Sequence, residues 1–197
     1  MLSVVIATSD SEFGLAPTLA ALVAGATAGI VREVIVADWG SRDKTAEVAD
    51  IAGCRIVVLD AAIGARLKAG AAAARAAWLM FIQPGVVLDV TWVAEVTRFI
   101  EAAERHDRAA AAAAVFRPAP GTRRSTLPET LARLRLSLGG RPEPAQGLII
   151  SKRLYDELGG HRAHSDVPEV DLLRRLRRRR IVLLRSVAVK IRDVDGS

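Results

Sequence analysis

The sequence contains one cysteine and few aromatic residues. Because Cys54 is alone among 197 residues, the chain can form neither a disulfide framework nor a cysteine metal cluster within itself, as is typical of a protein in the reducing cytoplasm. Phenylalanine, tryptophan and tyrosine together make up 4% of the residues, and no basic motif with interleaved aromatic residues is found. We therefore expect a cytoplasmic protein that does not bind nucleic acid.

The sequence also lacks a secretory signal and a clear membrane-spanning segment. Its N-terminus has neither a basic region nor a cleavage-site pattern. Residues 13–31 are uncharged, but they include Pro17, three glycines and two threonines, and alanine supplies much of their apolar character. We therefore expect a buried helix followed by a loop in this segment, and no helix that crosses a membrane.

The chain is rich in apolar residues, and its charge is distributed unevenly along the sequence. With 51% hydrophobic residues, a chain of this length is expected to fold as one domain that buries about 70% of its unfolded surface. The net charge of +6 divides into −2 for residues 1–120 and +8 for residues 121–197. This basic excess makes anionic lipid and phosphate-bearing substrates candidate partners of the C-terminal part.

Short β-branched runs alternate with helical patterns along the first half of the chain. The patterns predict strands at 2–7, 34–37, 55–59 and 78–82, and helices at 16–24, 45–52, 64–77 and 91–105. Such regular alternation implies right-handed crossovers between parallel strands. The sequence therefore predicts an α/β domain with a mostly parallel central sheet flanked by helices.

The second half of the chain is less regular. It predicts strands at 109–116, 147–151, 181–184 and 187–191, and helices at 152–158 and 170–179. Residues 117–146 are rich in proline and glycine around one basic amphipathic helix at 128–138. This segment is either a lid or an ordinary connection between elements.

The stretch 34–45, VIVADWGSRDKT, links a predicted strand to a predicted helix. In open α/β sheets, ligands bind just beyond the carboxyl ends of the strands. Asp38 at this position suits hydrogen bonding to a nucleotide base or a ribose hydroxyl. The alternative is a turn in which Asp38 satisfies only local backbone N–H groups.

Four segments together resemble one known family. They are LSVVIAT at the N-terminus, VIVADWGSRDKT, WLMFIQPG, and QGLIISKRLYDELGGHR followed by PEVDLLRRLRRR. In this order they are similar to family 2 glycosyltransferases of the GT-A fold, nearest to the short bacterial members. The resemblance implies a nucleotide diphosphate sugar of the UDP or GDP type and transfer with inversion, generally aided by Mg²⁺ or Mn²⁺. It divides the single domain 1–197 into a nucleotide-binding half (1–116), an insertion or lid (117–146) and an acceptor-side half (147–197).

The resemblance also assigns candidate nucleotide-binding residues. Asp38 stands where the family places the acid that contacts the base. Trp39 replaces a residue that is usually small or acidic, and it either stacks on the base or blocks the pocket. The remaining candidates are Thr8, Arg66, Gln83 and Gly85.

The metal-binding motif departs from the family pattern. Where the family carries an Asp-x-Asp-type motif, this chain has Gln83-Pro84-Gly85, and the next carboxylate is Asp89. A divalent ion needs hard oxygen ligands, so we assign no metal ligand and regard Mg²⁺ or Mn²⁺ as doubtful. In place of a metal, Arg66 or arginines of the C-terminal helix are candidates to neutralise the diphosphate.

The acceptor side departs as well, because Pro168-Glu169 replaces the family's Glu-Asp pair. Glu169 is the candidate catalytic base, with Asp166 and Asp171 as competitors. The alternative is that these acids only favour the dipole of the following helix. His161 and His164 lie near Asp166, but we expect solvated side chains there, not a metal site.

The basic run Arg174–Arg175 and 177–180 has two interpretations. Most of these arginines are expected to form a solvated helix face, whereas contact with an anionic membrane would place the protein peripherally at the inner membrane face. For the whole chain, we expect a sugar transferase that is weak or metal-independent. The alternative is an inactive transferase-like fold that binds a nucleotide, a membrane or a protein.

Overall fold

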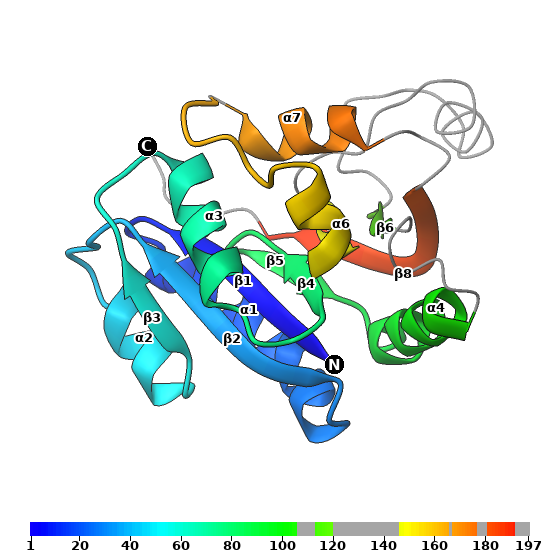
Figure 1. Cartoon of the computed structure of the whole chain (residues 1–197). Coiled ribbons are helices and arrows are strands. Elements are labelled where there is room, and N and C mark those ends of the chain that lie inside the picture. The colour runs from blue at the N-terminus through cyan, green and yellow to red at the C-terminus, as the bar shows by residue number, and fades with distance from the viewer. Residues whose placement is uncertain (106–112, 120–145, 166, 177–180, 192–197) are drawn as a thin grey trace, which may run out of the picture.

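The computed structural model describes residues 1–105, 113–119, 146–165, 167–176 and 181–191. Its centre is an eight-stranded sheet with the strand order β3-β2-β1-β4-β7-β6-β8-β5, and helices cover both faces (Figure 1). The predicted helix at 128–138, the basic run 177–180 and Asp166 lie outside the described residues, as does most of the predicted insertion. The predicted division of the domain at residues 117–146 therefore stays a prediction.

The N-terminal half of the sheet is parallel, as the sequence predicts. It consists of β1 (Leu2–Thr8), β2 (Val31–Asp38), β3 (Arg55–Val58) and β4 (Trp78–Phe81). β1 pairs with β2 and β4, and β2 pairs with β3, all in parallel. The carboxyl ends of these strands therefore meet at one edge, where the predicted nucleotide-binding residues follow them.

The C-terminal half is mixed. It contains β5 (Val86–Leu88), β6 (Ala113–Pro118), β7 (Leu148–Ser151) and β8 (Ile181–Lys190). β7 is antiparallel to both β4 and β6, β5 is antiparallel to β8, and β6 is parallel to β8. The sheet is thus parallel on the side of the predicted nucleotide site and mixed on the acceptor side.

Two strand predictions need correction. β5 was not predicted, because its three residues are too few to give a periodic pattern. β8 was predicted as two strands separated by Arg185 and Ser186, but the structure has one strand of ten residues. Ser186 is fully buried and its hydroxyl lies 2.9 Å from the hydroxyl of Thr91, so a polar residue occupies a satisfied position inside the strand.

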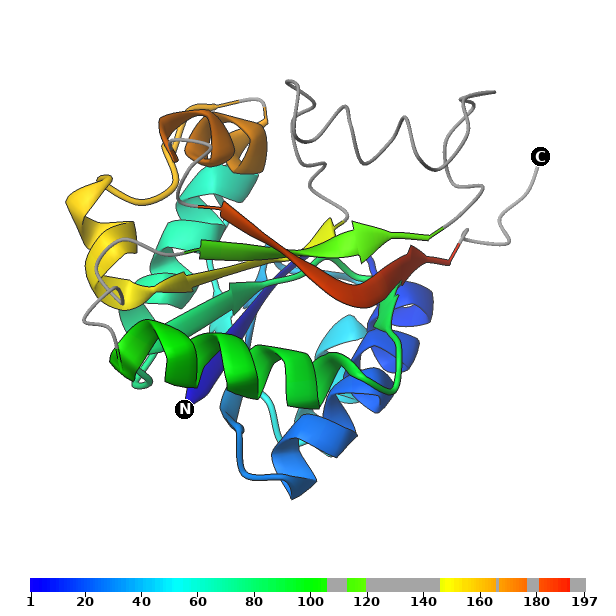
Figure 2. The same cartoon turned by 90° about the vertical axis from the view of Figure 1, so that its right-hand side faces the viewer.

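Two apolar clusters attach the helices to opposite faces of the sheet (Figure 2). On one face lie α1 (Glu12–Thr27), α2 (Thr45–Ile51) and α4 (Trp92–Arg105). The other face carries α3 (Ile63–Ala73), α6 (Lys152–Glu157) and α7 (Pro168–Arg175). Trp92, Val96 and Phe99 of α4 point inward, as their spacing predicts. No helix of the described residues is long and apolar enough to cross a membrane.

Candidate functional site

Asp38 ends β2 and is almost completely buried. Its Oδ1 accepts hydrogen bonds from the hydroxyls of Thr8 and Ser41, both at 2.6 Å. Its Oδ2 accepts from the backbone N–H groups of Gly40 and Ser41 at 2.8 and 2.7 Å. Burial opposes ionisation, but these bonds outweigh it and hold the pKa of Asp38 below its usual value.

The loops after β1 and β2 are joined by side chains of both. Asp10 Oδ1 accepts from the backbone N–H of Arg42 at 2.8 Å, while the hydroxyl of Ser41 accepts from the backbone N–H of Asp10 at 2.9 Å. Asp43 Oδ2 accepts from the backbone N–H of Glu12 at 3.0 Å. The turn that follows Asp38 is therefore tied to the loop before α1 and to its first residue, and we call this joined edge of the sheet the Asp38 platform.

Thr8 and Arg66 extend the platform toward α3. The backbone carbonyl of Thr8 accepts a hydrogen bond from Nη1 of Arg66, and Nε of Arg66 donates to the carbonyl of Ala61 at 3.1 Å. Arg66 is buried, and burial lowers the pKa of its guanidinium although nearby Asp38 partly opposes this. The structure thus places three of the predicted residues, Thr8, Asp38 and Arg66, in one connected group.

Trp39 and Gly85 lie at the margins of this group. Trp39 donates its backbone N–H to the carbonyl of Thr8 at 3.0 Å, and its side chain is 49% exposed. Gly85 has φ of +79° and forms the turn between β4 and β5, where its N–H donates to the carbonyl of Gly14 at 2.7 Å. The indole is accessible to a ligand, whereas the backbone of Gly85 connects the sheet to α1.

A second group of polar residues lies in a small pocket between β4, α3 and α7. Gln83, just after β4, donates its side-chain N–H to Oε1 of Glu169 on α7 at 2.9 Å. The rest of the lining consists mainly of apolar residues: Ala7, Ile63, Leu67, Phe81, Ile82, Gly147, Leu148 and Leu173. Two predicted site residues that are 86 positions apart in sequence therefore meet in one pocket.

Asp89, the first carboxylate after Gln83 in the sequence, is engaged elsewhere. Its Oδ1 accepts from the backbone N–H and hydroxyl of Thr91 at 2.8 and 2.6 Å, and its Oδ2 accepts from the backbone N–H of Val187 at 2.5 Å. These bonds outweigh burial and lower the pKa of Asp89. Within the described part of the chain, no three His, Cys, Asp or Glu side chains are arranged to hold a metal ion.

His161 is buried, which corrects the expectation of a solvated side chain, whereas His164 is exposed as expected. The hydroxyl of Tyr155 lies 3.0 Å from Nδ1 of His161 and accepts the backbone N–H of His161 at 3.0 Å. Phe81 stacks on Tyr155 and meets His161 edge-on. Burial first, and then the positive charge of Arg175, lower the pKa of His161 to about 3, so this histidine is neutral.

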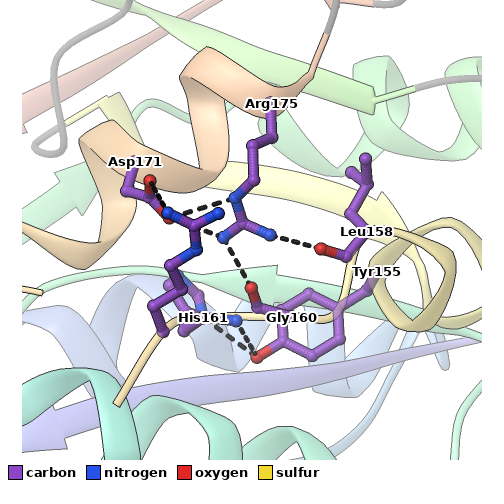
Figure 3. Close-up of polar contacts among 7 residues, drawn as sticks. Tyr155, Leu158, Gly160, His161, Asp171 and Arg175 are labelled. Atoms are coloured by element: carbon purple, nitrogen blue, oxygen red, sulfur yellow. Dashed lines mark hydrogen bonds and ion pairs between the residues drawn. The ribbon is translucent and has the colours of Figure 1, made fainter. Parts of the chain in front are cut away.

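Arg175 also differs from its expectation as part of a solvated face. Its Nη2 lies 2.8 Å from Oδ2 of Asp171 and donates to the carbonyl of Gly160 at 2.7 Å, and its Nη1 donates to the carbonyl of Leu158 (Figure 3). The sequence analysis missed Tyr155 and this role of Arg175. The spacing of four residues between Asp171 and Arg175 on one helix was the available signal for the ion pair.

Comparison with known proteins shows the family of this chain. The sequence matches the model of the family described as "Glycosyl transferase family 2" over residues 3–175. No curated protein matches the chain.

Several solved structures share the fold. Glucosyl-3-phosphoglycerate synthase from Mycobacterium tuberculosis, in complex with Mn²⁺, UDP and glucosyl-3-phosphoglycerate, has a TM-score of 0.72 and 20% identity, covering 98% of this chain and 72% of that one. TarS 1–349 from S. aureus, in complex with UDP-GlcNAc, has a TM-score of 0.71 and 16% identity, covering 98% of this chain and 59% of that one. These structures confirm the GT-A fold, and because the family model covers most of the sequence, the chain belongs to glycosyl transferase family 2.

Proposed function

We propose that this chain binds a nucleotide diphosphate sugar at the carboxyl ends of β1 and β2 and transfers the sugar with inversion to an acceptor hydroxyl. The observation that carries the proposal is the pairing of Gln83 with Glu169 in a pocket beside the Asp38 platform. Membership of the family supports the donor class. Of the two solved structures described above, the synthase contains Mn²⁺ and UDP, and TarS contains UDP-GlcNAc.

The nucleotide is proposed to lie against the platform formed by the loops after β1 and β2. The exposed indole of Trp39 offers a face on which a base can stack. Because its two oxygens already accept four hydrogen bonds, Asp38 is proposed to accept from the base by exchanging one of those bonds.

Glu169 is proposed to act as the catalytic base. The Gln83 amide donates to Oε1 of Glu169, which orients the carboxylate and leaves Oε2 to accept a proton. The acceptor oxygen then forms a bond to the anomeric carbon, the bond to the nucleoside diphosphate breaks, and the hydroxyl proton passes to Glu169.

The residues after β4 do not fit a divalent metal ion. Gln83 offers one neutral oxygen, its amide nitrogen is committed to Glu169, and both oxygens of Asp89 are occupied at the base of α4. We therefore propose metal-independent transfer, in which the buried cation Arg66 contributes positive charge near the diphosphate.

Measuring UDP release from UDP-sugars by the wild type and by Glu169→Gln tests this function. We expect the substitution to lower turnover by at least about 100-fold while UDP affinity stays within a factor of two, because the amide cannot take a proton. Glu157→Gln is the control, since it makes the same chemical change at an acid of α6 that pairs with the exposed Arg153. Turnover that Glu169→Gln leaves unchanged would contradict the proposed base.

One observation favours a second function. Three of the four hydrogen bonds to Asp38 come from Gly40 and Ser41 of its own turn, and the fourth comes from Thr8 on β1, so the chain itself supplies every partner, as expected of a structural acid. In that case the chain is an inactive transferase-like fold, and no nucleotide sugar is consumed by the wild type. The predicted contact with an anionic membrane also stays a proposal: Arg174 is exposed, but Arg175 faces inward.

A further inference from the structure

α7 carries Glu169 in its first turn and Arg175 in its last. Leu172 and Leu173 bury its apolar side against the sheet, and Leu173 also lines the pocket. Apolar packing is non-directional, so by itself it sets neither the rotation of a short helix nor its position along its axis. Directional bonds are needed to fix where Glu169 points.

Arg175 supplies such bonds. We define the Arg175 clamp as the guanidinium of Arg175 with the carboxylate of Asp171 and the backbone carbonyls of Leu158 and Gly160 (Figure 3). The planar guanidinium has donors in a fixed fork, so three acceptors constrain its position and orientation together. Because two of the acceptors belong to the segment after α6, the clamp joins α7 to that segment.

The segment after α6 is itself held firmly. Gly159 and Gly160 have φ of +76° and +66°, and a Cβ on Gly160 would come within 2.8 Å of the Tyr155 ring. Tyr155 in turn accepts the N–H of His161 and stacks on Phe81, which lies at the end of β4 two residues before Gln83. The carbonyls that receive Arg175 are thus fixed relative to the strand that presents Gln83.

We infer that Arg175 is a positioning residue that holds Glu169 opposite Gln83 through the Arg175 clamp. This inference rests on the proposed function for the importance of Glu169. It adds that the geometry of the base is set from the far end of α7, through contacts on the segment after α6, and not only by the pocket itself.

The direct measurement is the ¹⁵N side-chain amide signal of Gln83, followed by NMR as pH is changed. In the wild type the chemical shift of this signal should depend on pH, because the amide donates to the Glu169 carboxylate, and this pH-dependent movement of the signal should vanish in Glu169→Gln. Arg175→Met retains the apolar stem of the side chain but removes its donors. We expect Arg175→Met to lose more than about half of the pH-dependent movement of the Gln83 signal. It should also raise the rate of hydrogen exchange of α7 amides by at least about tenfold.

Matched variants separate positioning from general destabilisation. Arg153→Met makes the same chemical change at an exposed ion pair with Glu157 on α6 and should leave the Gln83 signal unchanged. Tyr155→Phe weakens the support of the segment after α6 without touching α7 and should reduce the movement partially. If Arg175→Met does not fold, Arg175→Lys is used, which reaches fewer acceptors and should give an intermediate loss.

The outcomes distinguish the inference from the proposed function, because the NMR signal requires no sugar transfer. An unchanged Gln83 movement in a folded Arg175 variant would overturn the positioning role even if Glu169 is the base. Loss of the movement in the Arg175 variant, together with turnover that survives Glu169→Gln, would support the clamp and overturn the base. If Arg175 positions Glu169 and Glu169 is the base, Arg175→Met should lower kcat more than it changes KM for the donor.

Discussion

The side-chain amide of Gln83 donates to the carboxylate of Glu169 at 2.9 Å, although the two residues are 86 positions apart in sequence. Gln83 follows the last parallel strand of the N-terminal half, and Glu169 begins the helix on the acceptor side. Their contact therefore joins the two halves of the sheet at the place where we propose that donor and acceptor meet.

Removing the amide should impair the base without removing it. In Gln83→Leu, Glu169 loses the donor that orients Oε1, and we expect turnover to fall by about 10-fold to 100-fold. Gln83→Glu instead places two carboxylates together, which raises the pKa of one of them. The pH optimum of turnover in this variant should therefore shift to higher pH. Rates of UDP release between pH 5 and pH 9 measure both effects, and unchanged profiles in both variants would show that Gln83 does not act on the base.

Asp38 should stabilise the fold as well as bind the nucleotide. In Asp38→Asn an amide replaces an oxygen that accepts from Thr8 and Ser41 or from the backbone, which should lower the free energy of unfolding by about 1–3 kcal/mol. Because the folded state lowers the pKa of Asp38, its stabilisation is present above the unfolded pKa and is lost as pH falls through the folded pKa. Urea unfolding at pH 7 and pH 3 should therefore show a smaller acid loss in the variant, and an equal loss would contradict this role.

His161 should make the protein sensitive to mild acid. Its pKa is lowered to about 3, so the unfolded state binds the proton first, and stability is lost as pH falls below the unfolded value. For an ordinary histidine pKa of about 6.5, the loss attributable to His161 is about 2 kcal/mol at pH 5. His161→Phe should have a lower free energy of unfolding than the wild type at pH 7.5. Between pH 7.5 and pH 5, however, it should lose less of that free energy than the wild type does.

The exposed His164 provides the control for that prediction. His164→Phe should keep the pH dependence of the wild type in the same urea unfolding measurements. A wild-type protein whose unfolding free energy is the same at pH 7.5 and pH 5 would show that His161 is not kept neutral by burial.

Two adjacent glycines should differ in their tolerance of alanine. Both have positive φ, but a Cβ on Gly160 would meet the Tyr155 ring, whereas nothing lies within 4 Å of one on Gly159. Gly160→Ala therefore adds a steric clash to the backbone strain that both variants share, and it should cost about 1–3 kcal/mol more than Gly159→Ala. Thermal unfolding compares the pair, and equal losses would mean that the ring moves freely.

The parallel half of the fold could be predicted from the sequence because its signals are local. β-branched runs, capping residues and glycine stops fixed the order of β1 to β4 and their helices within a few residues. β5 and β8 were harder, since three residues carry no period and a buried Ser186 resembles a turn residue.

The contacts of the candidate site depend on tertiary structure and could not be predicted. The pairing of Gln83 with Glu169 depends on the antiparallel insertion of β7 beside β4 and on how α7 docks. The two glycines before His161 predict a solvated loop, whereas its burial depends on the hydroxyl of Tyr155 and the ring of Phe81. Arg175 belongs to a basic run in sequence, and two of its three acceptors are backbone carbonyls that no sequence pattern reveals.

Metal-independent nucleotide binding is tested most directly by calorimetric titration of the protein with UDP and with GDP, each with and without Mn²⁺. We expect one of the two nucleotides to bind with a Kd that changes by less than about twofold on adding Mn²⁺, because the described residues include no group of three His, Cys, Asp or Glu side chains arranged to hold the ion. Binding that tightens about tenfold or more with Mn²⁺ would contradict metal independence, and the absence of binding by either nucleotide would contradict the proposed function itself.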